Sequence, residues 1–155
     1  MPLRSTTVKP RVARPLTRKL RRLVTLAPDE IAVLDDMQSS TRVIRRNREI
    51  MTEGRKYDAL LILIDGVSIR SRILHDGRRQ ILNIALPGDF IGFPSAFSER
   101  ALYSITALSD CVVAPVPFSR LEDLAATAGF KSCQFLNDTP SVFSGRRIYS
   151  ALLMA

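Results

Sequence analysis

The chain has 155 residues, of which 46% are hydrophobic and 25% charged, as expected for one ordinary soluble domain. No apolar run approaches the about 20 residues that cross a bilayer, which excludes a membrane-spanning protein. The two cysteines, Cys111 and Cys133, are too few for a disulfide framework and indicate buried thiols in a reducing cytoplasm.

The formal net charge of +8 is concentrated at the N-terminus. Residues 1–22 hold eight of the 23 basic residues and no acidic one, so the other 15 basic residues balance the 15 acidic ones. Together with Pro2, Pro10 and Pro15, this composition predicts a disordered basic arm over residues 1–17. The arm is either a solvated tail or a phosphate-binding segment; a transit peptide is disfavoured because amphipathic periodicity is missing. Candidates for non-specific nucleic-acid contact are Arg11, Arg14, Arg18, Lys19, Arg21 and Arg22.

Two short helices are predicted between residues 17 and 38. Pro28 suits the first turn of the second helix, where the acidic pair that follows it is also favoured. Ile31, Leu34 and Met37 then recur every three residues. They predict one apolar face that docks on the rest of the domain.

Strand patterns dominate the chain from about residue 41 to residue 117. A continuous apolar run over residues 60–64 predicts a buried strand, and alternating segments follow it. Aspartate-glycine and proline-glycine turns separate these segments at residues 65–66, 76–77 and 87–88. Short strands with helices only at the two ends predict a mainly β antiparallel sandwich or barrel with flanking helices.

Several separated motifs occur in a recognisable order: E-x-x-x-E-G from Glu49, L-I-L-x-x-G from Leu61, D-G-R-R-Q-I-L from Asp76, L-P-G-D-x-I-G from Leu86 and S-I-x-A-L-S-D-C from Ser104. Over residues 18–125 this order resembles the cyclic-nucleotide-binding domain of the Crp/Fnr family of bacterial transcription regulators, its Fnr-like and FixK-like branches above all. The resemblance implies a double-stranded β-roll, or jelly roll, flanked by helices. It also implies a sensor that responds to a small effector.

The resemblance is weakest at the positions that bind the ligand in family members. In members that bind cyclic nucleotides, a glutamate after the last glycine of the fourth motif binds the ribose, and an arginine-serine pair binds the phosphate. Here Phe93 follows Gly92, and Ala101 and Leu102 replace the pair, with Arg100 one position away. This implies that cyclic AMP is not the effector. Phe93 either fills the roll or lines a site for another effector, and the candidate site residues are Ile91, Gly92, Phe93, Ser95, Arg100, Ala101, Tyr103 and Ser104.

Cofactor chemistry and catalysis are not indicated. Residues 1–110 contain no cysteine for an Fnr-type iron–sulfur cluster. His75 is the single histidine. One histidine cannot build the metal site of a cupin, which needs two or three, and no second histidine is present to activate a nucleophile. We therefore predict a non-enzymatic protein without metal or cofactor.

Family members continue into a long dimerisation helix and a helix-turn-helix. Residues 126–155 carry Gly129, Pro140 and Gly145, which predict a short, broken helical tail. We expect an effector domain without a helix-turn-helix, or alternatively a stand-alone scaffold that dimerises with itself or with a full-length homologue. A homodimer buried partly through residues 119–155 is expected. DNA affinity is expected to be weak and confined to residues 1–22, whose deletion should leave the fold intact.

Overall fold

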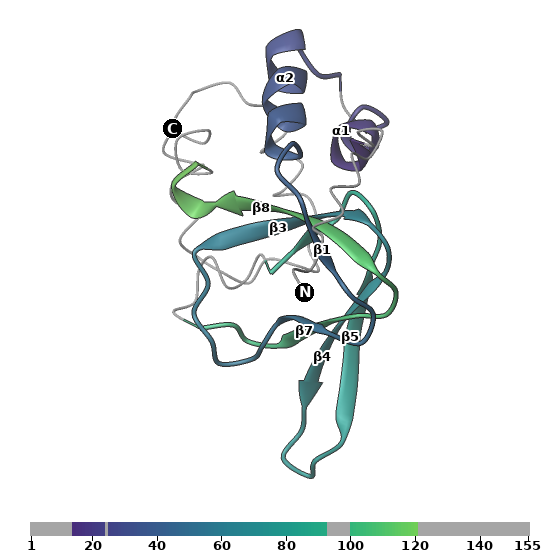
Figure 1. Cartoon of the computed structure of the whole chain (residues 1–155), viewed down its shortest axis with the longest axis vertical. Coiled ribbons are helices and arrows are strands. Elements are labelled where there is room, and N and C mark those ends of the chain that lie inside the picture. The colour runs from purple at the N-terminus through teal and green to yellow at the C-terminus, as the bar shows by residue number, and fades with distance from the viewer. Residues whose placement is uncertain (1–13, 24, 93–99, 121–155) are drawn as a thin grey trace, which may run out of the picture.

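A computed structural model describes residues 14–23, 25–92 and 100–120 of the chain. Within these residues, two N-terminal helices precede eight strands (Figure 1). The elements are α1 Pro15–Leu20, α2 Pro28–Met37, β1 Arg42–Ile44, β2 Glu49–Met51, β3 Ala59–Asp65, β4 Ser68–Ile73, β5 Arg79–Ala85, β6 Phe90–Ile91, β7 Ser104–Ala107 and β8 Cys111–Pro117. No described helix is both long and apolar enough to cross a bilayer.

The strands form two four-stranded antiparallel sheets. The helix-side sheet has the order β1-β8-β3-β6, and the hairpin sheet has the order β2-β7-β4-β5. In Figure 1 the two helices lie above the helix-side sheet, and the β4–β5 hairpin extends away from the body on the opposite side. The predicted mainly β roll with flanking helices is confirmed.

Two apolar clusters hold these layers together. One lies between the sheets and joins Leu61 and Leu63 of β3 to Ile105 and Ala107 of β7. The other lies between the helix-side sheet and the helices and contains Ile62 and Ile64 of the same strand. Because β3 is covered on both faces, it needs apolar residues at successive positions, which explains the continuous apolar run at residues 60–64.

α1 includes residues that the sequence assigned to the disordered arm. It begins at Pro15, where proline suits the first helical position, and it buries Leu16, Thr17 and Leu20. The predicted boundary at residue 17 is therefore moved to the start of this helix. Leu16 and Leu20 belong to the core, which argues against the expectation that deleting residues 1–22 leaves the fold intact.

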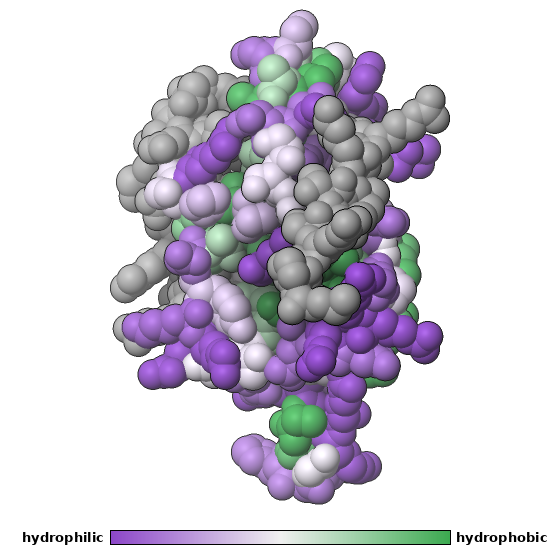
Figure 2. Space-filling view, in the orientation of Figure 1, coloured by the Kyte–Doolittle hydropathy of each residue, from purple (hydrophilic) through white to green (hydrophobic). Residues whose placement is uncertain are grey.

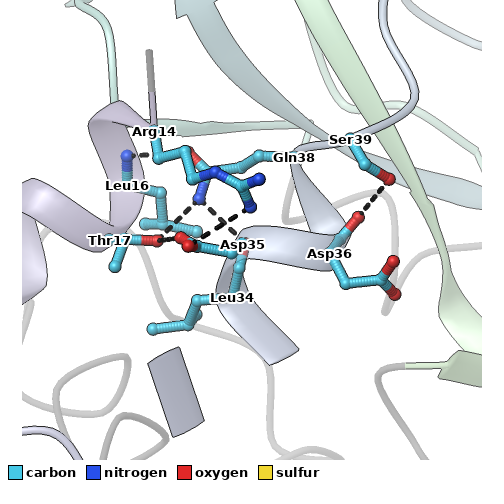
Figure 3. A network of polar contacts seen from close by, with 8 residues as sticks. All are labelled: Arg14, Leu16, Thr17, Leu34, Asp35, Asp36, Gln38 and Ser39. Carbon is cyan, nitrogen blue, oxygen red and sulfur yellow. Dashed lines mark hydrogen bonds and ion pairs between the residues drawn. The ribbon is translucent and has the colours of Figure 1, made fainter. Parts of the chain in front are cut away.

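A buried polar network fastens α1 to α2 (Figure 3). The Leu16 backbone N–H donates to Gln38 Oε1 at 3.0 Å, and Gln38 Nε2 donates to Thr17 Oγ1 at 2.9 Å and to the Leu34 carbonyl at 2.8 Å. The Thr17 hydroxyl donates in turn to Asp35 Oδ1 at 2.7 Å. Gln38 is 1% exposed, and with all three amide contacts made its burial carries no penalty for lost hydrogen bonds to water.

α2 begins at Pro28, as predicted, but its buried face is shifted. Leu34 and Met37 are buried, whereas Ile31 is half-buried and Glu30 takes the inner position. The Glu30 carboxylate accepts a hydrogen bond from the Ala27 backbone N–H at 2.8 Å, so the side chain folds back over the start of the helix.

The β4–β5 hairpin exposes apolar residues on one face. β5 has one residue more than β4 in the ladder, because Arg70 pairs with Asn83 and Ser71 with Ile81. Since directly paired residues share a face, Ile81 and Ile84 lie on the same face as Ile73. These three isoleucines are 58%, 56% and 60% exposed. Figure 2 shows apolar side chains on the protruding hairpin among hydrophilic ones.

Candidate functional site

The predicted effector residues begin at the end of β6. Ile91, the last residue of β6, packs in the cluster between the sheets. Gly92 follows with a φ of 81°, a left-handed conformation that glycine adopts without strain. Phe93 and Ser95 lie outside the described residues, so the two interpretations of Phe93 remain predictions.

The chain is described again from Arg100, where the loop after β2 supports it. Arg100 Nη1 donates to the Gly54 carbonyl at 3.0 Å, and the Ala101 backbone donates to the Arg55 carbonyl at 2.8 Å. The Ser104 hydroxyl accepts from the Glu53 backbone N–H at 3.0 Å. Arg100 and Ser104 are thus engaged by the backbone of this loop.

Tyr103 is a second predicted residue that the structure places inside the roll. It packs in the same cluster as Ile91 and is 7% exposed. Its hydroxyl has no hydrogen-bond partner in the part of the chain that the structure describes. Burial raises the pKa of the phenol to about 12, against the opposing effect of the Arg70 charge. The structure therefore joins Ile91 and Tyr103 in one interior.

Arg70 also lies at this interior, and the sequence reasoning missed it. Arg70 pairs with Ile105 of β7, and Ile105 belongs to the core between the sheets. Because directly paired residues share a face, the Arg70 side chain also projects from the inner face of its sheet. The Arg70 Cζ atom lies 4.3 Å from the centroid of the Tyr103 ring, within the range of a cation–π contact. Alternating strands usually bury their apolar residues. Here the register places an arginine on the inner face, and Ile73 on the outer one.

The charges around Arg70 are unequally compensated. Arg72, two residues along the same strand, has its Nε atom 3.0 Å from Glu53 Oε1. Among the described residues, Arg70 has no carboxylate partner. Ser68, on the same face, also has a buried hydroxyl without a partner in that part of the chain. It pairs with Ala107, four residues beyond Tyr103, and so belongs to a different part of the interior.

No catalytic or metal-binding arrangement emerges among these residues. The described residues contain no group of three or more histidine, cysteine or acidic side chains placed to hold a metal ion. Burial raises the pKa of the Cys111 thiol, the change that makes it a poor nucleophile. Among the described residues, the charged group in contact with the Tyr103 ring is the Arg70 guanidinium, which is a hydrogen-bond donor and not a base.

The candidate arm residues are only partly free to meet phosphate. Arg14 Nη1 lies 3.3 Å from Asp35 Oδ2, and Lys19 pairs with Asp89 in the turn before β6. Arg18, Arg21 and Arg22 are exposed. Arg11 lies outside the described residues, so nucleic-acid contact through the arm remains a prediction.

The chain resembles known regulators over most of this fold. Residues 41–128, more than half of the chain, match the family described as cyclic nucleotide-binding domain. The transcriptional activator protein FnrL of Cereibacter sphaeroides is 27% identical over 96 residues, which cover 60% of this chain and 38% of FnrL. The nitrogen fixation regulation protein FixK of Azorhizobium caulinodans is 35% identical over 69 residues, which cover 44% of this chain and 27% of FixK. The chain spans about two fifths of the length of FnrL.

A solved structure supports the same fold. The catabolite activator protein of Thermus thermophilus matches with a TM-score of 0.64 at 20% identity, and the match covers 83% of this chain and 58% of that chain. At this identity the likeness concerns the arrangement of the strands and helices and not the ligand.

Proposed function

Because the chain belongs to the cyclic nucleotide-binding domain family, we propose that it is the effector domain of a Crp/Fnr-type bacterial transcription regulator. The observation that carries this proposal is the match of the two-sheet roll to that family, together with the names of FnrL and FixK, which are regulators. On this proposal, the interior between the two sheets receives the effector. A DNA-reading element would come from another domain.

Cyclic AMP is not its effector on this proposal. The sequence has Phe93 where a ribose-binding glutamate would stand, and an aromatic ring cannot accept a hydroxyl hydrogen bond in its place. Ala101 and Leu102 lack the groups that hold a cyclic phosphate, and the Arg100 side chain donates to Gly54.

Thermal unfolding with and without cyclic AMP tests this point. A ligand at a hundred times its Kd stabilises a protein by about 2.7 kcal/mol, which raises the Tm of a domain of this size by several degrees. We expect no such shift at millimolar cyclic AMP. A saturable shift of several degrees would contradict the proposal.

A scaffold that pairs with another protein is the second candidate. The observation in its favour is the exposed apolar face formed by Ile73, Ile81 and Ile84, since such patches often mark interfaces. The two candidates differ in their response to small molecules. An effector domain is stabilised by at least one small-molecule class, whereas a scaffold dimerises at tens of micromolar and responds to none. Thermal unfolding with a panel of small molecules, together with mass measurement in solution, separates them.

A further inference from the structure

Within the described residues, the interior beside β7 holds two hydrogen-bonding side chains, Tyr103 and Arg70, that lack a protein acceptor. Tyr103 buries a hydroxyl that has no partner among the described residues. Arg70 is half-buried beside it and has no carboxylate partner within that part of the chain. A buried donor without an acceptor destabilises the fold, and an uncompensated guanidinium attracts an anion.

Neighbouring arginines do not share this state. Arg72 is compensated by Glu53, at 3.0 Å between Nε and Oε1, and Arg100 donates to the Gly54 carbonyl. The Arg70 guanidinium therefore has no counterion among the described residues, and it lies against the face of the Tyr103 ring. The ring supplies a cation–π contact but no lone pair along the N–H directions of the guanidinium.

We propose that Arg70 and Tyr103 form the binding site for the oxyanion group, a carboxylate or a phosphate, of a small organic effector. The Arg70 guanidinium donates to the oxyanion, and the Tyr103 hydroxyl donates to the same group. An oxyanion has acceptor lone pairs on two or more oxygens, so one group satisfies both residues. The inference rests on the proposed role as an effector domain and gives that role a ligand class.

The positions of the two residues link the site to the rest of the roll. Arg70 lies on β4 and Tyr103 directly precedes β7, and these neighbouring strands pair from Ser68 to Ser71. Tyr103 also packs with Ile91 at the end of β6. Tyr103 and Ile91 are 7% and 1% exposed, so the Tyr103 side chain is shielded from bulk solvent.

NMR of the full chain labelled with ¹³C-tyrosine tests the site. The chain has three tyrosines, and the signal missing from a Tyr103→Phe variant identifies Tyr103. The probes are benzoate and phenyl phosphate, with benzyl alcohol as the neutral control. We expect a saturable shift of the Tyr103 signal with at least one anion and none with benzyl alcohol. The two anionic probes distinguish a carboxylate site from a phosphate site.

Variants then assign the binding to the two side chains. Arg70→Gln removes the charge and is expected to weaken anion binding about tenfold or more, as for loss of a charge-assisted hydrogen bond. Arg42→Gln is the matched control, because Arg42 is an exposed arginine on the helix-side sheet, and it should leave the affinity unchanged. Tyr103→Phe keeps the ring under Arg70 and should also weaken binding. Without anion it should unfold at the same or a higher temperature, because it removes a buried donor that lacks a partner.

Several outcomes would overturn the inference. They are a missing Tyr103 shift with both anions at tens of millimolar, an equal shift with benzyl alcohol, and full affinity in Arg70→Gln. If that variant does not fold, full affinity in Tyr103→Phe has the same meaning. A neutral compound that stabilises the wild-type chain and the Arg70→Gln variant equally would overturn the anion site. That result would leave the role as an effector domain standing. A shift with cyclic AMP that depends on Arg70 would support the site and contradict the exclusion of cyclic AMP.

Discussion

The two sheets of the roll differ in what covers them. The two central strands of the helix-side sheet, β3 and β8, are buried on both faces, by the hairpin sheet on one side and by α1 and α2 on the other. The hairpin sheet shares the inner core but leaves apolar residues exposed along β4 and β5. Apolar strand residues of the same type therefore contribute very differently to stability. The helix-side sheet stabilises the fold, and the hairpin sheet carries the groups suited to bind something else, Arg70 inside and the isoleucines outside.

Removing α1 tests the comparison with the largest expected effect. Deleting residues 1–22 removes Leu16 and Leu20, which are 2% and 3% exposed, and the hydrogen bonds to Gln38. Each buried leucine lost costs about 2–5 kcal/mol, so we expect the free energy of unfolding to fall by at least about 4 kcal/mol. Urea unfolding followed by circular dichroism measures it. Deleting residues 1–13 is the control, since a chain that starts at Arg14 keeps every contact described above. A fully stable 1–22 deletion would show that α1 contributes little.

Alanine substitutions at a buried and an exposed isoleucine are expected to differ next most in the free energy of unfolding. Ile62 of β3 is 0% exposed and Ile84 of β5 is 56% exposed. Ile62→Ala is expected to lower the free energy of unfolding by about 2–5 kcal/mol through the cavity it leaves. Ile84→Ala should change it by no more than about 0.5 kcal/mol. Equal losses in the two variants, measured by urea unfolding, would mean that the hairpin face is covered by something in solution.

Substitutions at two glycines distinguish the cost of backbone strain from the cost of steric overlap. Gly77 in the hairpin turn and Gly88 below α1 both have left-handed φ angles, of 81° and 92°. A Cβ at Gly77 meets nothing within 4 Å, whereas one at Gly88 lies 2.9 Å from the Pro15 carbonyl oxygen. We expect Gly77→Ala to cost about 1–2 kcal/mol from the left-handed conformation alone. Gly88→Ala should cost clearly more, because α1 must also move. Thermal unfolding of both variants gives the comparison, and equal costs would argue against a rigidly seated α1.

A dependence on alkaline pH is expected from Tyr103, which directly precedes β7. Burial raises the pKa of Tyr103 to about 12 from a usual 10.0. Below pH 10 the phenol is neutral in both states. Between pH 10 and about 12 the unfolded state loses the proton first, so the free energy of unfolding falls as pH rises, by at most about 1.4 kcal/mol per pH unit. Urea unfolding from pH 9 to pH 12 measures this slope. Tyr103→Phe should reduce the slope, and an unchanged slope would assign it to other groups.

The candidate site was predictable in part. The motif at residues 86–92 led to Ile91 and, with the strand after it, to Tyr103, because both follow a turn that the sequence identifies. Arg70 was not predicted, since it stands in an ordinary alternating segment and carries no motif. The signal that could have found it is the reversal of polarity, with Arg70 and Arg72 on one face and Ile69 and Ile73 on the other. That pattern shows two faces but does not say which one is inner.

The sequence by itself determined the local structure of the chain. Turn residues at Gly66 and Gly88, the proline at the start of α2 and the apolar run of β3 each act through neighbours a few residues away, so they could be recognised one by one. Only the tertiary structure decided that α1 belongs to the domain and that Arg70 faces Tyr103. Both depend on partners distant in the chain: Gln38 and the helix-side sheet for α1, and the register of β4 against β7 for Arg70. A strand pattern has two faces related by a shift of one residue, and the pairing with other strands selects which of them is buried.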